Sequence, residues 1–210
     1  MKWLLLIVVM AGCNVAPSSP QKNGSQSALL AAKDCEDPDG NIECCFANMP
    51  GNLSAVVQVK KRDAGELLTI NGRLFHADGA TPFARVIMYA YHTDSTGRYT
   101  KRGDETGIQK FHGHLHGWAK TDDSGRYTIK TIRPASYPNS TIPAHIHAAI
   151  KEPSGKTYYI SDFVFEGDPF VTRQYLQSLE KWKHPGSTGI VTLRKENGEW
   201  WGTRDIVLPN

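Results

Sequence analysis

From about Ser54 to the C-terminus, short runs rich in Val, Ile, Thr, Tyr and Phe alternate with turn signals such as Asp-Gly, Thr-Gly and Ser-Gly. Runs of this length, either continuously apolar or alternating with period two, are typical of β-strands. The predicted strands are Leu67–Phe75, Ala84–Tyr91, Leu115–Lys120, Tyr127–Ile132, Ala144–Lys151, Tyr158–Phe165, Ile190–Arg194 and Trp200–Val207. Many short strands without an internal repeat predict one all-β domain over residues 54–210, a β-sandwich or β-barrel with long connecting loops.

Only one segment has helical periodicity. Phe170–Lys183 carries Tyr175, Leu176 and Leu179 at helical spacing and follows an Asp-Pro pair, so it predicts one short helix in the C-terminal half. The 24 Lys and Arg residues nearly balance 21 Asp and Glu residues, for a formal net charge of +3. This balance does not indicate a nucleic-acid partner.

The N-terminus has the pattern of a bacterial export signal. Residues 1–12 contain Lys2 and an apolar run, Trp3–Met10, that is far shorter than the roughly 20 residues needed to span a bilayer. Met10-Ala11-Gly12-Cys13 resembles a lipobox, in which the cysteine thiol receives a lipid, and plain secretion is the alternative. Residues 13–53 then predict a lipid-anchored tether with a cysteine-containing segment, so we expect an exported, membrane-anchored lipoprotein facing the periplasm or the cell surface.

Three further cysteines follow the predicted lipidation site. In an oxidising compartment, Cys35 could pair with Cys44 or with Cys45, because adjacent cysteines rarely bond to each other. One thiol is then left over, either buried or available for an intermolecular bond. A zinc site is the weaker alternative, since no histidine lies between Cys35 and Cys45.

One predicted strand carries a His-x-His pair. His145 and His147 would point to the same side of that strand and could reach one metal ion. Most isolated His-x-His pairs are solvated, but here the flanking residues are apolar, which favours a site. Two tyrosines lie upstream in loops, Tyr99 after Gly97-Arg98 and Tyr137 before Pro138. Each of them alone reads as an ordinary loop residue.

Taken together, the order of these features resembles the intradiol ring-cleavage dioxygenases, such as protocatechuate 3,4-dioxygenase and catechol 1,2-dioxygenase. The resemblance covers about Leu67 to Pro169, and the Tyr-Pro pair followed by Pro-x-His-x-His is its most specific part. Its blocks are Gly97-Arg98-Tyr99, Thr121-Asp122 with Gly125-Arg126-Tyr127, Thr131-Ile132-Arg133-Pro134 with Tyr137-Pro138, Pro143-Ala144-His145-Ile146-His147, and Phe165-Glu166-Gly167-Asp168-Pro169.

The resemblance implies an enzyme that cleaves a catechol-type ring with O2 at a non-haem Fe(III) ion. It places the metal ligands at Tyr99, Tyr137, His145 and His147. Tyr137 would be the axial ligand that the substrate displaces, opposite His147, while Tyr99 and His145 stay equatorial. Phenolate oxygen is a hard anionic donor that suits Fe(III).

Two positions depart from the family. Ile142 stands where family enzymes commonly have Arg, and Asp162 stands where they commonly have Gln. An ionised Asp162 would oppose an anionic catecholate, so slow turnover of simple catechol and protocatechuate is expected. The histidines His112, His114 and His116, or Arg133 beside the Tyr137 loop, could supply a compensating positive charge. The short segment before Ser54 has no room for the N-terminal helical domain of the catechol 1,2-type enzymes.

A second histidine cluster lies outside these blocks. His112, His114 and His116 would share one face if the strand began that early, and could contact substrate or bind a second metal. A polar loop at the mouth of the pocket is the favoured interpretation. The remaining histidines, His76, His92 and His184, are isolated and are predicted to lie at the surface.

Two other functions fit the same residues. A β-sandwich of the transthyretin or carbohydrate-module type could use the histidines structurally or for zinc, but it would not need two tyrosines in register with His-x-His. A lipid-anchored protein could instead bind catechols or metal without turnover.

Overall fold

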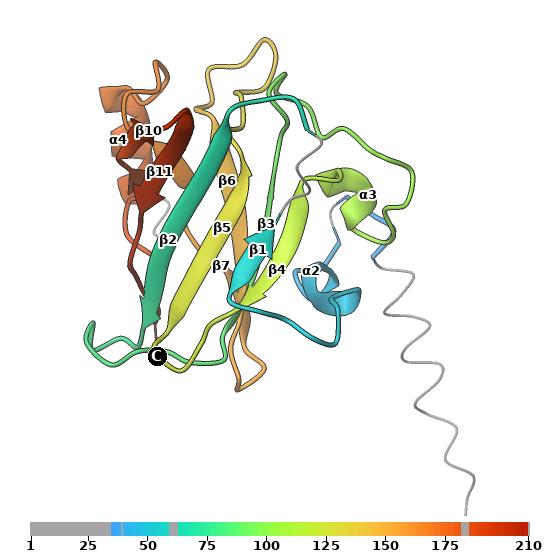
Figure 1. The fold of residues 1–210 in the computed structure, drawn as a ribbon, viewed down its shortest axis with the longest axis vertical. Coiled ribbons are helices and arrows are strands. Elements are labelled where there is room, and N and C mark those ends of the chain that lie inside the picture. The colour runs from blue at the N-terminus through green and yellow to red at the C-terminus, as the bar shows by residue number, and fades with distance from the viewer. Residues whose placement is uncertain (1–34, 39, 59–62, 182–184, 210) are drawn as a thin grey trace, which may run out of the picture.

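The structure is a computed structural model that describes residues 35–38, 40–58, 63–181 and 185–209. Two mixed sheets pack face to face as a β-sandwich (Figure 1), which confirms the predicted fold class. The first sheet has the order β1-β5-β2-β11-β10, and β12 also pairs with β2. Its strands are β1 (Val56–Gln58), β2 (Leu67–Phe75), β5 (Arg126–Ile132), β10 (Leu193–Glu196), β11 (Glu199–Thr203) and β12 (Ile206–Val207).

The second sheet carries the His-x-His pair. It has the order β4-β3-β6-β8-β9, and β7 also pairs with β6. Its strands are β3 (Ile87–His92), β4 (His116–Lys120), β6 (His145–Lys151), β7 (Thr157–Tyr159), β8 (Phe163–Phe165) and β9 (Ile190–Val191). β3 runs antiparallel to both β4 and β6, whereas β8 and β9 are parallel.

The main core lies between the sheets. Because side chains alternate along a strand, β6 sends Ile146, Ala148 and Ile150 into this core. These three side chains are fully buried. β3 contributes Met88 and Ala90 in the same way. The alternate positions of both strands therefore project from the outer face of the second sheet.

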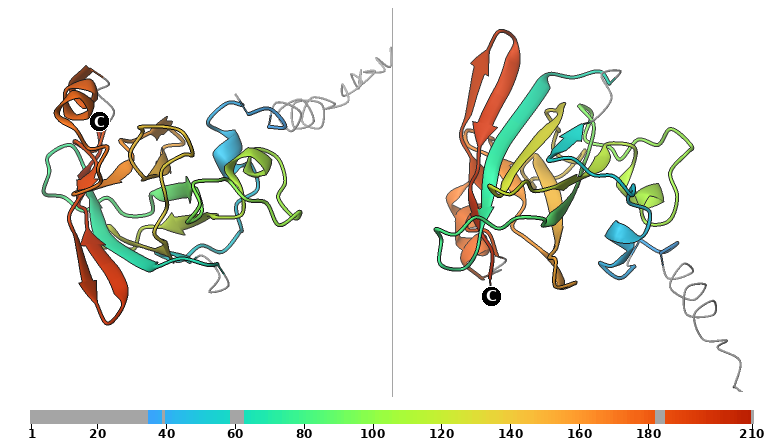
Figure 2. Two further views of the ribbon diagram at one scale, coloured as in Figure 1. Left: turned by 90° about the horizontal axis from the view of Figure 1, so that it is seen from above. Right: turned by 60° about the horizontal axis from the view of Figure 1, so that its bottom comes forward.

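A thin layer of chain covers part of that outer face (Figure 2). It contains the short helices α2 (Cys44–Ala47) and α3 (Gln109–His112). Cys45 and Phe46 of α2 pack against Tyr89 of β3 in a second apolar cluster. This part of the predicted tether segment thus lies on the sandwich.

The cysteines divide into one bonded pair and one buried thiol. Cys35 and Cys44 form a disulfide, with their Cα atoms 5.2 Å apart. Cys45 is free and buried. Burial raises the pKa of its thiol to about 11, so the thiol stays protonated at neutral pH. Of the two pairings left open by the sequence, the structure has the one to Cys44.

Three predicted strands are each divided in two. Tyr158–Phe165 breaks at Ser161, whose amide donates to the carbonyl of Pro185 rather than to a neighbouring strand. Ile190–Arg194 crosses from the second sheet to the first, as β9 and then β10, and Trp200–Val207 becomes β11 and β12. The predicted helix is α4 (Arg173–Lys181), drawn in orange at the left of Figure 1.

The surface prediction for His92 is wrong. Its side chain is 3% exposed, and its ring nitrogens lie 2.7 Å from the Thr93 carbonyl and 2.7 Å from the Thr131 hydroxyl. The alternation of side chains along a strand does not reveal that His92, the last residue of β3, contacts a threonine of the opposite sheet. His76 is half-buried and stacks on Phe83, and His184 lies outside the described residues.

The export signal, Cys13 and most of the predicted tether also lie outside the described residues. Within the part of the chain that the structure describes, no helix is long and apolar enough to cross a bilayer.

Candidate metal centre

The strand β6 places both histidines of the His-x-His pair on the outer face of the second sheet. His145 pairs with Val164 of β8, and His147 pairs with Tyr91 of β3. Because β6 has paired neighbours on both sides here, its backbone is fixed and the two imidazoles project from a rigid support.

The loop after β3 brings Tyr99 to the same place. Asp94 holds this loop by accepting hydrogen bonds from the amides of Thr96 and Arg98 and from the Thr100 hydroxyl. Partial burial would raise the pKa of Asp94, but the hydrogen bonds from Thr100 and Thr96 outweigh it and lower the pKa to about 2. The carboxylate is therefore ionised throughout the physiological range.

Two close contacts join the loops of Tyr99 and Tyr137. Gly97 has φ 78°, and a Cβ atom there would lie 2.0 Å from the carbonyl oxygen of Ser136. Only glycine permits this approach. The hydroxyl of Thr93 donates to the carbonyl of Ala135 across the same gap at 2.6 Å. These contacts fix the two tyrosines relative to each other.

Four side chains converge. The Oη atoms of Tyr99 and Tyr137 are 2.7 Å apart. The Oη atom of Tyr137 lies 3.2 Å from Nε2 of His145 and 3.3 Å from Nε2 of His147, and the two Nε2 atoms are 3.0 Å apart. The structure thus brings together all four residues that the sequence predicted as metal ligands.

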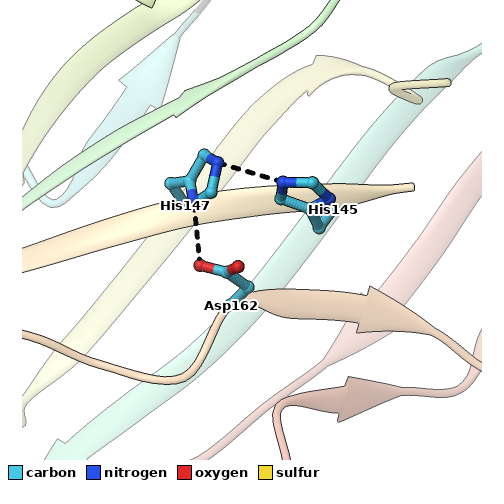
Figure 3. Close-up of side chains that lie close together, drawn as sticks. All are labelled: His145, His147 and Asp162. Carbon is cyan, nitrogen blue, oxygen red and sulfur yellow. Dashed lines mark hydrogen bonds and ion pairs between the residues drawn. The ribbon is translucent and has the colours of Figure 1, made fainter. Parts of the chain in front are cut away.

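In each imidazole, the hydrogen-bond partner of Nδ1 determines whether Nε2 can offer a lone pair to a metal (Figure 3). Nδ1 of His145 lies 2.6 Å from the Pro143 carbonyl, and Nδ1 of His147 lies 2.9 Å from a carboxylate oxygen of Asp162. Both partners are acceptors, so each Nδ1 carries the hydrogen and each Nε2 presents its lone pair to the cluster. Two lone pairs facing each other at this distance require a proton or a cation between them.

Burial disfavours charge on these side chains when no cation is present. It raises the pKa of Tyr99, with a further contribution from the hydrogen bond to Tyr137, and it raises the pKa of Tyr137. It also lowers the pKa of His145, and the nearby His147 lowers it further. A metal cation would reverse the effect on the tyrosines by stabilising phenolate. Two phenol oxygens and two unprotonated imidazole nitrogens fit a hard, highly charged ion.

Asp162 offers an alternative donor. His145, His147 and Asp162 form the one group of His, Cys, Asp and Glu side chains, among the described residues, with ligand atoms all within 4.8 Å of one another. The carboxylate of Asp162, however, contacts Nδ1 of His147, the nitrogen that points away from the cluster. This geometry makes Asp162 a partner that orients His147.

A cavity of about 360 Å³ opens beside His147. Its volume lies in the range of small-molecule sites. The other lining residues are Tyr91, Tyr159, Ile160, Ser161, Asp162, Tyr175, Leu179 and Thr188, of which Tyr175 and Leu179 come from α4. None of these described lining residues is Lys or Arg. The described lining is mainly aromatic and apolar, and Asp162 is the one acidic side chain in it.

Two residues that the sequence predicted to affect catalysis lie outside the lining of this cavity. Ile142 is 49% exposed. The guanidinium of Arg133 lies 4.8 Å from the ring centre of Trp200 and 5.8 Å from that of Phe165, in cation–π contact with both. The residues that line the cavity include neither.

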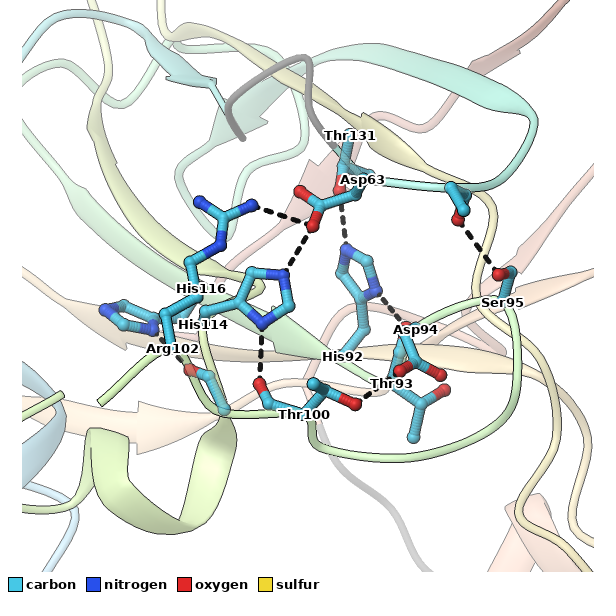
Figure 4. A network of polar contacts seen from close by, with 12 residues as sticks. Asp63, His92, Thr93, Asp94, Ser95, Thr100, Arg102, His114, His116 and Thr131 are labelled. Carbon is cyan, nitrogen blue, oxygen red and sulfur yellow. Dashed lines mark hydrogen bonds and ion pairs between the residues drawn. The ribbon is translucent and has the colours of Figure 1, made fainter. Parts of the chain in front are cut away.

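The second histidine cluster does not share a strand face. His112 ends α3, His114 lies in a loop, and only His116 belongs to β4. Figure 4 shows His114 between the Asp63 carboxylate and the Thr100 carbonyl, each at 2.6 Å. Nδ1 of His116 contacts the carbonyl of Gly113 at 2.6 Å. His114 and His116 thus have polar partners near the surface, whereas His112 is buried and stacks on Tyr91.

Sequence reasoning missed the residues that support the cluster. Asp94 and Gly97 resemble any turn, and Tyr91 and Tyr175 resemble core residues of a strand and a helix. The Asp-Ser-Thr-Gly spacing before Tyr99 was an available signal, because it is typical of a loop held by an aspartate side chain. No sequence signal places α4 over the cavity.

The fold and the four-residue cluster together describe a β-sandwich with a candidate metal centre on the outside of one sheet. A family model described as dioxygenase matches residues 46–199. The chain therefore belongs to the intradiol ring-cleavage dioxygenase family, whose members use Fe(III).

Solved structures share this fold at low sequence identity. One is the dioxygenase domain of a dioxygenase and carbohydrate-binding fusion protein from Streptomyces sp. SirexAA-E. It is 23% identical with a TM-score of 0.56, and the match covers 77% of this chain and 90% of that domain. Catechol 1,2-dioxygenase from Pseudomonas arvilla C-1 is 18% identical with a TM-score of 0.56, covering 76% and 59%. An intradiol ring-cleavage dioxygenase from Tetranychus urticae is 17% identical with a TM-score of 0.53, covering 75% and 86%.

Proposed function

We propose that this protein is an Fe(III) intradiol dioxygenase that opens a catechol-type ring with O2 between the two hydroxyl-bearing carbons. The observation that carries the proposal is the convergence of Tyr99, Tyr137, His145 and His147, with both Nε2 lone pairs directed inward. When bound there, Fe(III) supplies a Lewis acid that makes a coordinated catecholate reactive toward O2.

The residues of the chain then have distinct tasks. Tyr99 and His145 would hold the ion throughout. Tyr137 would hold it until the substrate binds, and its Oη atom would then accept a proton from the catechol. His147 stays in place because Asp162 holds its Nδ1.

The cavity favours an uncharged substrate. With no Lys or Arg in its described lining and Asp162 at its edge, a ring carboxylate would find no positive partner and one repelling charge. Tyr159, Tyr175 and Leu179 instead offer apolar contact to ring substituents. We therefore propose neutral catechols, including larger ones, as the substrate class in preference to protocatechuate.

Oxygen uptake by the iron-loaded protein, measured across a panel of neutral and carboxylated catechols, tests this proposal. We expect a red-brown protein, from tyrosinate-to-Fe(III) charge transfer, that consumes O2 with neutral catechols. Tyr99→Phe should lose most of the colour, because it removes one phenolate donor. Tyr127→Phe is the control, since Tyr127 is a buried tyrosine outside the cluster whose hydroxyl donates to the carbonyl of Arg204. A colourless protein with stoichiometric zinc would reject the proposal.

A second candidate function is catechol binding without turnover. Ile142 and Asp162 favour it, because neither supplies the hydrogen-bond donor that family enzymes commonly have there. Loss of one preorganised donor typically costs about 10²–10³ in rate. The double variant Ile142→Arg with Asp162→Gln should gain rate if the protein is a slow enzyme. Unchanged iron binding with no gain on any catechol would favour sequestration.

We propose that Arg133 helps to position the Tyr137 loop and does not contact the substrate. It precedes the Tyr137 loop, and its guanidinium packs on Trp200 rather than lining the cavity. Arg133→Lys should therefore alter iron affinity or colour before it alters substrate preference.

We also propose that the protein is exported and anchored to a membrane by lipid on Cys13. The lipobox-like sequence supports this. Cys13→Ser should move the protein from the membrane fraction to the soluble fraction without changing its colour. Membrane association that survives the substitution would reject lipid anchoring.

A further inference from the structure

A row of aromatic rings runs across the outer face of the second sheet, away from the candidate metal centre. Tyr89 and Tyr91 share one face of β3, and Trp118 and His116 of β4 lie opposite them in register. On the other side of β3, Tyr91 is opposite His147 of β6. The row thus begins at a candidate ligand and ends at Trp118.

Neighbouring rings in this row are in contact. Ring centres are separated by 4.6 Å between His147 and Tyr91, 5.6 Å between Tyr91 and Tyr89, and 5.2 Å between Tyr89 and Trp118. His112 stacks on Tyr91 at 3.6 Å with ring planes 10° apart. Trp118 is half-buried and lines a second cavity of about 290 Å³, so the row reaches solvent there.

Outside the candidate metal centre, the hydroxyl of Tyr89 also contacts a histidine. Tyr89 is fully buried, and its Oη atom lies 2.9 Å from Nδ1 of His112, which is itself 8% exposed. Burial raises the pKa of Tyr89 and lowers the pKa of His112 to about 3, so a neutral phenol faces a neutral imidazole. In the tautomer with the ring hydrogen on Nε2, the phenol donates to Nδ1 of His112. Loss of one electron makes a phenol strongly acidic. A phenol with a base already in hydrogen-bond contact can release electron and proton together.

We propose that Tyr89 and His112 form a redox-active pair within a one-electron relay between the metal pocket and Trp118. In the oxidising step Tyr89 loses one electron, its O–H bond breaks, and the proton forms a bond with Nδ1 of His112. The products are a neutral tyrosyl radical and a protonated imidazole.

The relay removes stray oxidising equivalents from the pocket. The oxidant is an oxygen-derived radical of the hydroxyl or peroxyl class, which gains the electron through Tyr91 and takes a proton from water. A thiol or ascorbate-type reductant in solvent then returns one electron through Trp118, and His112 returns the proton to Tyr89. The source of the oxidant rests on the proposed oxygenase function, whereas the redox pair itself does not.

Photo-oxidation of the metal-free protein tests the pair without any dependence on iron. Gln58 is exposed and lines the same cavity as Trp118, so Gln58→Cys provides a thiol for a ruthenium photosensitiser. Cys13→Ser in the same chain keeps the label at one place, because Cys35 and Cys44 are bonded and Cys45 is 1% exposed. Flash-quench oxidation generates Ru(III), which returns to Ru(II) by taking one electron from Trp118.

We expect a transient neutral tyrosyl radical by electron paramagnetic resonance. Tyr89→Phe should abolish it while keeping the ring contacts, and Tyr127→Phe, whose hydroxyl faces a carbonyl that cannot accept a proton, should leave it unchanged. His112→Gln should also lose the signal, since an amide can accept the hydrogen bond but not the proton. A radical of undiminished yield in Tyr89→Phe or His112→Gln would overturn the proposal.

A second variant covers the case in which Tyr89→Phe does not fold. Trp118→Phe leaves Tyr89 and His112 intact but removes the entry point of the relay, so the tyrosyl signal should be lost. An unchanged signal in this variant, or Ru(III) reduction without any tyrosyl radical in the labelled parent protein, would also overturn the proposal.

Discussion

At the scale of single residues, Asp162 has a different task from the one its charge suggests. An acidic side chain beside an anionic substrate would simply oppose binding. In the structure, its carboxylate lies 2.9 Å from Nδ1 of His147, so part of its negative charge is directed to that ring. A carboxylate in this position fixes the tautomer and makes the imidazole a stronger donor to a metal.

Replacing Asp162 with Asn keeps an oxygen acceptor for Nδ1 but removes the charge. We expect Asp162→Asn to retain iron and to shift the tyrosinate-to-Fe(III) absorption to longer wavelength, because a weaker donor at His147 leaves the ion more electron-poor. The visible spectrum and the Fe(III)/Fe(II) potential measure this. A spectrum identical to that of the parent protein would show that Asp162 does not act through His147.

Gly97 is the residue on which the junction of the two tyrosine loops depends. Gly97→Ala should cost about 1–2 kcal/mol in backbone strain alone, and the added Cβ would also collide with the Ser136 carbonyl. We therefore expect loss of stoichiometric iron binding, measured by metal analysis and colour. Gly155→Ala is the control: Gly155 has φ 92° but no neighbour within 4 Å of its Cβ position, so iron binding should persist.

The sequence was sufficient to predict the four candidate ligands but not the residues that position them. A His-x-His pair on a strand has a fixed geometry, and the order of motifs around it is specific. Asp94 acts within its own loop, through bonds to Thr96, Arg98 and Thr100. Gly97, in contrast, acts through a contact between loops that are far apart in the sequence, its close approach to Ser136. Local sequence patterns do not predict such contacts.

At the scale of elements, strands of useful length were predictable and very short elements were not. β2 has the predicted bounds, because its nine residues keep a clear pattern between turn signals. α2 and α3 have four residues each, which is about one helical turn and too few to show a period. They form because tertiary contacts and a disulfide hold them against the second sheet.

The disulfide of α2 should contribute measurable stability. Closing the short loop from Cys35 to Cys44 restricts the unfolded chain, for an expected gain of about 2–3 kcal/mol. Chemical denaturation with and without reductant measures this gain. The double variant Cys35→Ala with Cys44→Ala should match the reduced parent protein and should not respond to reductant. A response of equal size in the double variant would assign the effect to another group.

At the scale of the whole molecule, one buried histidine ties folding to pH. Burial lowers the pKa of His92 to about 4. Above about pH 6.5 the imidazole is neutral in both folded and unfolded chains, so the stability that His92 contributes to the fold is fully present. Between about pH 6.5 and 4 only the unfolded chain binds the proton, and stability should fall by about 3 kcal/mol, with no further loss from this group below pH 4.

Unfolding free energies measured from pH 8 to pH 4 test this expectation. His92→Gln should be less stable at pH 8, because it alters the contacts to Thr93 and Thr131, and it should show a flatter profile below pH 6.5. His76→Gln should keep the slope of the parent protein. If the slope survives in His92→Gln, other groups cause the acid sensitivity.

The two faces of β3 and β6 have different tasks, so substitutions on one face need not affect the other. One face of each strand fills the space between the sheets, and the other carries the donors, the pocket wall and the row of rings. Substitutions at the pocket wall can therefore accumulate and change which molecules enter without loosening the sandwich. Conversely, drift among the apolar residues of the interior leaves the donors facing one another. A lineage built on this arrangement can explore new substrates while keeping one scaffold.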